Sequence, residues 1–213
     1  MRNLIFVLVC LFSCSVAAQT VYTEDQVYTT NIYFFYDKSN NLPITGLLKG
    51  YHENGQLKFE RMYKDGWKEG MEKYYYDNGQ CSIEGVCRDG LQEGLSKNFY
   101  YNGQCSREAT YSKGKEEGLC KWYHENGQLL SEGTFRDGKQ EGLRKWYHEN
   151  GQCSGEVTYR EGEQEGLYKQ YYENGQCSFE GAFRNGKQEG LQKWYHENGQ
   201  LLSEGMYKDG KQE

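Results

Sequence analysis

The chain has 213 residues, a formal net charge of −6, 27 glycines and one proline. An acidic chain with interleaved charges does not favour binding to nucleic acid or to anionic lipid, because both require clusters of Lys and Arg. Only 36% of the residues are hydrophobic but 15% are aromatic, so the sequence predicts a buried surface made largely of aromatic rings.

Residues 1–18 have the features of an export signal. Arg2 gives a short positive start, residues 4–12 form an apolar run, and Val16-Ala17-Ala18 provides small residues for signal peptidase. The run is too short for a stable membrane anchor, so we expect a mature chain that begins at Gln19 and does not insert into a membrane. An alternative interpretation is a lipoprotein signal with Cys14 as the lipidated residue. In either case the chain is exported, to the periplasm, the cell surface or the medium.

Residues 19–45 precede a regular repeat. They include Phe34-Phe35-Tyr36 and Asn40-Asn41, and we expect them to form a divergent first hairpin that caps the array. From Gly46 onward, three series of glycines recur every 24 residues without an insertion. A fixed period of this size is typical of small units that stack on their neighbours, so residues 46–213 are predicted to form seven repeats.

Each repeat reads as two short antiparallel strands. In the repeat 142–165, Asn150-Gly151 predicts a two-residue type I′ turn, and Glu161-Gly162 marks a second turn. The residues between the turns are rich in Tyr, Trp, Phe and Thr, as strands are, and show no helical period. The predicted fold is therefore all-β: an elongated, twisted antiparallel meander of about fourteen strands plus the N-terminal piece.

The hairpin register follows from charge pairing. A turn at Asn150-Gly151 places Lys145 opposite Glu156 and Tyr147 opposite Ser154. An opposite-charge pair stands at the same position in the other repeats, which supports the assignment: Lys49/Glu60, Lys73/Glu84, Lys97/Glu108, Lys121/Glu132, Lys169/Glu180 and Lys193/Glu204.

The two faces of the predicted sheet both carry aromatic residues, so the sequence does not decide which one is buried. Leu143 and Tyr147 fall on the Lys-Glu face; on the other face we expect Trp146, His148, Cys153 and Tyr159. The turn glycines are separated by intervals of 11 and 13 residues in alternation. This difference predicts a longer loop or a bulge in the Gly-Lys-Gln-Glu-Gly corner.

The repeat resembles the MORN repeat in its bacterial variant form. The resemblance rests on Gly-Leu-x-Lys-Trp-Tyr-x-Glu-Asn-Gly-Gln-Leu-x-x-Glu-Gly-x-Tyr-x-Asp-Gly-Lys, seen in residues 118–139 and 190–211, and it extends from Gly46 to Glu213. It implies β-hairpins laid side by side in an elongated sheet. Many bacterial proteins of this kind are catalogued as YwqK-type antitoxins, which implies a toxin protein as partner.

The histidines and cysteines do not predict a metal site or a disulfide framework. His52, His124, His148 and His196 share one repeat position, so neighbouring copies lie two strands, about 9–10 Å, apart. That separation is too large for a shared metal ion, and it also forbids a disulfide such as Cys81–Cys105. We expect the six cysteines after residue 18 to be largely unpaired, with Cys87 and Cys120 the only candidates for an irregular bridge.

No motif points to catalysis. Every recurring Glu stands beside a Lys, which predicts an ion-pair ladder rather than a pair of carboxyls with different environments. We therefore expect a non-enzymatic protein without catalytic residues, metal or cofactor. The candidate binding surface comprises Trp122, Trp146, Trp194, His124, His148 and His196, although packing within the sheet is the alternative role for the tryptophans.

Two functions from different classes fit these features. The first is an exported scaffold for protein–protein interaction; the second is an antitoxin or immunity-type inhibitor that binds a toxin along the array. We also expect the final hairpin, Leu191–Tyr207, to present an open strand edge. Such an edge either frays or pairs with a partner or a second copy of the chain.

Overall fold

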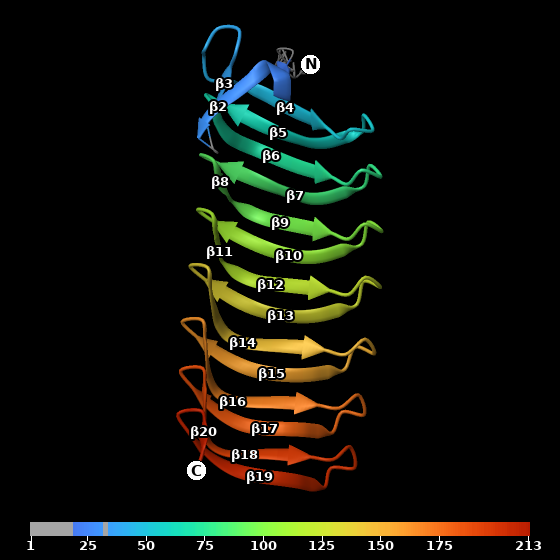
Figure 1. Ribbon diagram of the computed structural model, residues 1–213, viewed down its shortest axis with the longest axis vertical. Coiled ribbons are helices and arrows are strands. Elements are labelled where there is room, and N and C mark those ends of the chain that lie inside the picture. Colours follow the sequence, from blue (N-terminus) through green and yellow to red (C-terminus); the bar gives the residue numbers. More distant parts are fainter. Residues whose placement is uncertain (1–18, 32–33) are drawn as a thin grey trace, which may run out of the picture.

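The computed structural model describes residues 19–31 and 34–213, which form one open, 20-stranded sheet (Figure 1). The hairpins follow one another in chain order from β4 to β19 along the long axis (Figure 1). Among these described residues none is in an α-helix. The fold is thus the all-β repeat array that the sequence predicts. The expected export signal and Cys14 lie outside the described residues.

Each repeat contributes two long strands that pair with each other and with the neighbouring repeats. In two repeats the corner forms a short strand of its own before the next long strand begins: β8 (Leu91–Gln92) and β11 (Lys115–Glu116). The last corner forms the short strand β20 (Lys211–Gln212). The long strands are β4 (Gly46–Tyr51), β5 (Leu57–Lys64), β6 (Trp67–Tyr75), β7 (Cys81–Arg88), β9 (Gly94–Phe99), β10 (Cys105–Ser112), β12 (Gly118–Tyr123), β13 (Leu129–Arg136), β14 (Lys139–Tyr147), β15 (Cys153–Arg160), β16 (Glu163–Tyr171), β17 (Cys177–Arg184), β18 (Lys187–Tyr195) and β19 (Leu201–Lys208).

The N-terminal piece is a hairpin with one additional strand. Strands β2 (Val27–Asn31) and β3 (Phe34–Asp37) pair antiparallel. Strand β1 (Val21–Thr23), followed by a single 3-10 turn, η1 (Glu24–Gln26), pairs with β4 in parallel, so the expectation of a purely antiparallel sheet is wrong at this end. A parallel neighbour requires a long connection, and the segment between β1 and β4, which includes the β2–β3 hairpin, provides it.

The N-terminal piece also completes the most apolar core of the molecule. Ile44 and Leu48 are 0% and 1% exposed, and the cluster extends to Val27, Phe59 and Tyr63. Phe35 packs against this cluster, with its ring centroid 5.0 Å from that of Tyr63. Residues before Gly46 therefore cover the first repeat hairpin with aromatic and aliphatic side chains.

The charge register predicted from the sequence is confirmed. Lys145 lies opposite Glu156 within its hairpin, and Glu156 also lies opposite Lys169 of the next repeat. The same pairing holds in the other repeats, so Lys and Glu alternate across fourteen successive long strands, from Lys49 on β4 to Glu204 on β19. We call this row the charge ladder.

The turn between the two strands of a hairpin is not the predicted type I′ turn. Gly151 has φ +83°, but Asn150 does not have the positive φ that a type I′ turn needs at both positions. Instead, His148 and Gln152 close a three-residue loop in which the Gly151 N–H donates to His148 O at 2.9 Å. The Asn150 side chain fixes this form, because its oxygen accepts from the Gln152 N–H at 2.9 Å and its amide donates to Glu173 O at 3.3 Å.

The longer loop changes which side chains share a face. Ser154 becomes a bulged residue, so Tyr147 lies opposite Cys153 and not opposite Ser154 as predicted. Cys153 therefore belongs to the face that carries Lys145 and Glu156, and its expected position on the other face is wrong.

The type I′ turn occurs at the second turn of each repeat. Glu161 and Gly162 have φ values of +55° and +90°, and the Asp-Gly and Asn-Gly pairs at this position behave alike. The predicted bulge in the corner is also confirmed. Gly133 pairs with Arg144 and Thr134 with Glu141, which leaves Gly142 and Leu143 as a two-residue bulge. Gly142 has φ +78°, and the strand bends there.

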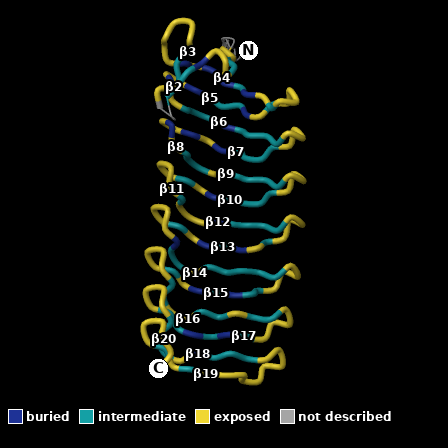
Figure 2. Tube along the Cα trace, in the orientation of Figure 1, coloured by how far each residue is buried: buried dark blue, intermediate teal, exposed yellow. Residues whose placement is uncertain are grey.

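The bend gives the sheet an inner and an outer face. The inner face carries the side chains of Arg144, Trp146 and Val157, and the corner residue Gln140 reaches back to Arg144 over it. Val157 and Cys120 on this face are fully buried. Figure 2 shows buried and half-buried residues along the strands and exposed residues at the turns of both edges.

Candidate interaction surface

The three tryptophans predicted as binding residues lie on the inner face, packed against side chains of the chain itself. The Arg144 guanidinium lies over the rings of Trp122 and Trp146, 4.7 Å and 5.0 Å from their centroids. Trp194 packs between Phe179 and Tyr207, with centroid separations of 5.4 Å and 6.3 Å. Each ring therefore has intramolecular partners on the inner face.

The predicted histidines lie at the hairpin turns, apart from the tryptophans. His148 Nε2 is 2.9 Å from the Tyr171 carbonyl oxygen, 23 residues further along the chain. His52 makes the same contact with Tyr75 O, and the Tyr100 hydroxyl donates to Tyr123 O at 2.7 Å. A side chain at this position thus ties one turn to the next repeat, which explains why His and Tyr replace one another there.

Two histidines lack this contact. His124 Nε2 is buried without a hydrogen-bond partner, and His196 is exposed. The structure therefore does not bring the six predicted residues together on one surface.

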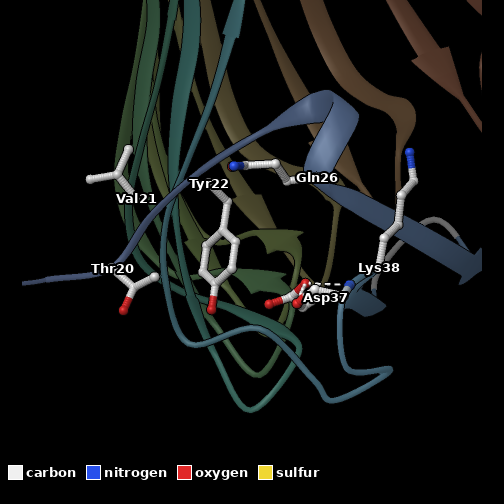
Figure 3. A pocket seen from close by; sticks show the side chains of 7 residues that line it. Thr20, Val21, Tyr22, Gln26, Asp37 and Lys38 are labelled. Carbon is white, nitrogen blue, oxygen red and sulfur yellow. Dashed lines mark hydrogen bonds between the residues drawn. The ribbon is translucent and has the colours of Figure 1, made fainter.

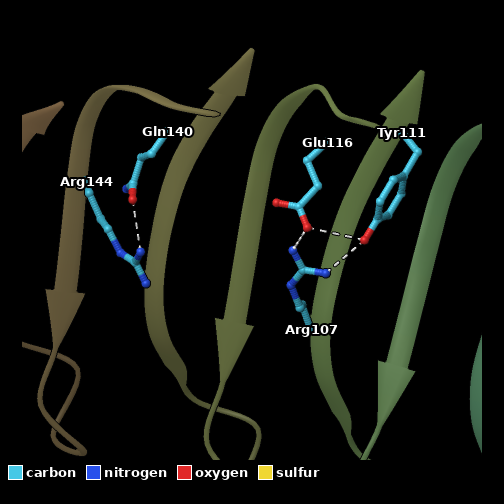
Figure 4. A network of polar contacts seen from close by, with 5 residues as sticks. All are labelled: Arg107, Tyr111, Glu116, Gln140 and Arg144. Atoms are coloured by element: carbon cyan, nitrogen blue, oxygen red, sulfur yellow. Dashed lines mark hydrogen bonds and ion pairs between the residues drawn. The ribbon is translucent and has the colours of Figure 1, made fainter. Parts of the chain in front are cut away.

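Two polar clusters lie on the inner face, one around Arg107 and one around Arg144 (Figure 4), and both guanidinium groups lie over the Trp122 ring. Arg107 forms an ion pair with Glu116 and donates to the Tyr111 hydroxyl at 3.0 Å. One repeat further on, Arg144 donates to Gln140 at 3.1 Å without a carboxylate partner. Burial lowers the pKa of Arg144. These groups contact one another and leave the inner face occupied.

The charge ladder lies on the outer face with its ion pairs partly exposed. The Lys97 Nζ–Glu108 Oε1 distance is 2.9 Å, and the Lys193 Nζ–Glu180 Oε1 distance across repeats is 3.6 Å. The hydrogen bond from Lys97 lowers the pKa of the Glu108 carboxyl. A Lys of either neighbouring strand can thus serve as the partner of a ladder Glu.

A row of exposed apolar side chains runs beside the ladder. One residue in each repeat from the second onward contributes to it, and Leu143, for example, is 47% exposed while it pairs across the hairpin with Thr158. Equivalent residues lie two strands, about 9–10 Å, apart. We call this set the outer apolar row: Met71, Leu95, Leu119, Leu143, Leu167 and Leu191, each between 43% and 55% exposed.

The outer apolar row is the candidate surface that sequence reasoning missed. The sequence places Leu143 on the Lys-Glu face but does not decide whether that face is buried. One feature of the sequence could have predicted the row: every repeat has an apolar residue on the face that carries the Lys and Glu residues. Exposed apolar side chains that gather on one face, rather than being scattered singly over the surface, are typical of an interaction site.

The N-terminal end has a hollow beside β1 and β3, lined by residues that include Tyr22, Gln26 and Asp37 (Figure 3). The charged side chains of this hollow already have partners. Ser39 donates to Asp37 from its hydroxyl at 2.7 Å, which lowers the pKa of that carboxyl, and Lys38 Nζ donates to Asp25 O at 2.7 Å.

Within 19–31 and 34–213, no group of three or more His, Cys, Asp or Glu residues is placed to hold a metal ion. The six cysteines in these ranges are free. The same part of the chain contains no helix that is long and apolar enough to cross a membrane.

The sequence pattern of one family matches most of the chain. The MORN repeat variant pattern matches seven segments that begin 24 residues apart: 44–65, 68–85, 92–113, 116–137, 140–161, 164–185 and 188–209. No curated protein sequence matches the chain.

Solved structures show only a distant likeness. A mutant of S. aureus TarM in complex with fondaparinux, alpha-GlcNAc-glycerol and UDP is 15% identical, with a TM-score of 0.32; the match covers 45% of this chain and 19% of that one. A further TarM structure has 16% identity and a TM-score of 0.31, with the same coverage. The GtfA/B complex has 16% identity and a TM-score of 0.25, covering 48% of this chain and 18% of that one.

Proposed function

This chain belongs to the MORN repeat variant family, and we propose that it is an exported, non-enzymatic scaffold for protein–protein interaction. The observation that carries the proposal is the outer apolar row. Its six large side chains are about half exposed, and each repeat from the second onward adds one contact of the same kind. A surface of this type binds through the number and spacing of its contacts, as repeat arrays do, rather than through one unique residue.

The inner face is a less suitable binding surface than the outer face, which supports the proposal. Its tryptophans already pack against Arg144 and neighbouring rings, so an approaching protein would have to displace these contacts. The outer apolar row meets solvent without such a partner layer, and the charge ladder beside it supplies polar contacts of both signs. Protein interfaces combine an apolar centre with a polar rim in the same way.

The test is capture of binding proteins from envelope extracts with the mature chain as bait. Leu119→Asp combined with Leu143→Asp places charge in the outer apolar row at two exposed positions. Leu130→Asp is the matched control, because Leu130 is 36% exposed but lies at a bulge next to the hairpin turn, outside the row. We expect partners that the control retains and the row variant loses. Identical partners for all three proteins would refute the proposal.

An inhibitor that binds a toxin along the array would use the same contacts. A toxin protein among the row-dependent partners is the result that selects this second function. Export is tested separately by the N-terminus of the mature protein. A chain that begins at Gln19 supports signal peptidase cleavage, a lipidated Cys14 supports the lipoprotein alternative, and a chain that retains Met1 contradicts export.

A further inference from the structure

We propose that the outer face binds a second copy of this chain, face to face, with the two arrays running in opposite directions. The inference rests on the proposed function, because it names the partner of the same surface. It follows from two patterns on the outer face, the order of signs in the charge ladder and the position of the outer apolar row. Both patterns are self-complementary under one two-fold axis, which lies parallel to the strands.

The charge ladder of one copy matches, with opposite signs, the charge ladder of a second copy that runs in the opposite direction. It begins with a Lys on β4 and ends with a Glu on β19, and the sign changes at every strand between them. When a second copy is turned about an axis parallel to the strands, Lys49 lies opposite Glu204, Lys97 opposite Glu156, and Lys121 opposite Glu132. Each of the seven Lys then faces a Glu of the other copy. A shift by one strand would place like charges opposite one another, so the charges also define the register.

The same axis brings apolar side chains together toward the two ends of the array and places leucines against threonines at its centre. A rotation about the strand direction keeps each residue's position along the strand, so each residue of the outer apolar row faces the side chain at the same height on a second strand of the other copy. Leu191 then faces Met62, and Leu167 faces Val86. Toward the centre, Leu119 faces Thr134. These pairs follow from the hairpin register. Leu47 of the first repeat lies opposite Met62, and the six row residues lie opposite these side chains of the second strand: Val86, Thr110, Thr134, Thr158, Ala182 and Met206.

The available surface is large enough for a stable dimer. The fourteen long strands from β4 to β19 leave thirteen intervals of about 4.8 Å, which gives a contact roughly 62 Å long. A band that covers the outer apolar row and the charge ladder is about 13 Å wide, so each copy contributes on the order of 800 Å². Stable interfaces of standard size bury about 800 Å² per partner.

Cross-linking of the mature chain tests the arrangement directly. A carbodiimide joins a Lys to a Glu without a spacer, so it reports only pairs in direct contact. Lys97 and Glu156 lie five strand intervals, about 24 Å, apart within one chain, and a link between them must join two copies. We expect a dimer mass in sedimentation at low salt together with Lys97–Glu156 and Lys49–Glu204 links. Neighbouring pairs such as Lys97–Glu108 will be linked in any case.

Variants separate this inference from the proposed function. Leu119→Asp with Leu143→Asp is expected to weaken the dimer by at least about tenfold, and Leu130→Asp to leave it unchanged. A monomer at the highest soluble concentration overturns the inference. If that monomer still captures envelope proteins in a row-dependent manner, the proposed function stands alone. A dimer linked only through β19 would assign self-association to the Leu191–Tyr207 hairpin and would also overturn the face-to-face arrangement.

Discussion

Tyr147 donates its phenolic hydroxyl to the carboxylate of Glu132 on the adjacent strand, with 2.8 Å between the two oxygens. Burial, together with this hydrogen bond, raises the pKa of Tyr147 to about 12. The third repeat carries Phe99 at the equivalent position, so the array tolerates the loss of this hydroxyl. The same contact recurs in four other repeats: Tyr75–Glu60, Tyr123–Glu108, Tyr171–Glu156 and Tyr195–Glu180.

The raised tyrosine pKa values predict a loss of stability at alkaline pH. A phenol whose folded pKa is about 12 and whose ordinary pKa is 10.0 stabilises the fold fully below pH 10. That stability is lost as the pH rises through about 12. Urea unfolding of a variant with Tyr123→Phe, Tyr147→Phe and Tyr171→Phe should show a smaller decrease in stability between about pH 10 and 12 than the wild type, because three of the five tyrosine–glutamate contacts are removed.

Tyr172→Phe is the control for this experiment, because its hydroxyl donates to the Tyr195 carbonyl oxygen and not to a carboxylate. It removes one hydroxyl hydrogen bond that involves no carboxylate and should lower stability by about 1 kcal/mol. An unchanged slope in the triple variant would mean that the tyrosine–glutamate contacts do not govern the alkaline transition.

The charge register could be predicted from the sequence because Lys145 and Glu156 form a pair that every repeat reproduces. The turn type could not. Asn-Gly favours a type I′ turn in isolation, but the Asn150 side chain bonds to Gln152 and to the next repeat, and these contacts select a three-residue loop. The position of Cys153 was mispredicted for the same reason, since one bulged residue reverses the alternation of side chains.

The buried face could not be predicted because both faces carry aromatic residues. What decides it is the bend at Gly142, which brings the corner toward Arg144 and Trp146, and bending depends on contacts between repeats rather than on one repeat's sequence. Without that bend, the exposure of Leu143 is not apparent. The outer apolar row therefore emerges only when the repeats are stacked.

Neighbouring residues on opposite faces should differ sharply in their contribution to stability. Val157 is fully buried on the inner face, whereas Thr158 on the outer face is exposed. Val157→Ala removes two buried carbon groups and should lower the free energy of unfolding by about 2 kcal/mol. Thr158→Ala should change it by less than about 0.5 kcal/mol. Urea denaturation followed by circular dichroism measures both. Equal effects would contradict the assignment of inner and outer faces.

His124 is a position where a substitution should increase stability. Its Nε2 is buried without a partner, whereas the hydroxyl of Tyr100 at the equivalent position bonds to the next repeat at 2.7 Å. His124→Tyr should form the same bond with the Tyr147 carbonyl oxygen and raise the free energy of unfolding by about 1 kcal/mol. His196→Tyr is the control, because His196 is exposed, and it should have little effect. A destabilised His124→Tyr protein would show that the histidine is satisfied in another way.

The last prediction concerns thiol reactivity. Cys87 and Cys120 lie on the inner face and are 2% and 0% exposed, and burial, followed by the nearby Glu72 carboxylate, raises the pKa of Cys87 to about 12. Only the thiolate reacts with iodoacetamide, so both should be alkylated at least about tenfold more slowly than Cys153 in the native protein at pH 8. Cys153 is half-buried on the outer face and serves as the internal reference.

In urea, all six cysteines after residue 18 should react at similar rates. Mass spectrometry of peptides over a time course gives each rate. Rapid labelling of Cys120 in the folded protein would mean that the inner face opens to solvent, and a Cys81–Cys105 disulfide would mean that adjacent repeats approach more closely than two strand spacings allow.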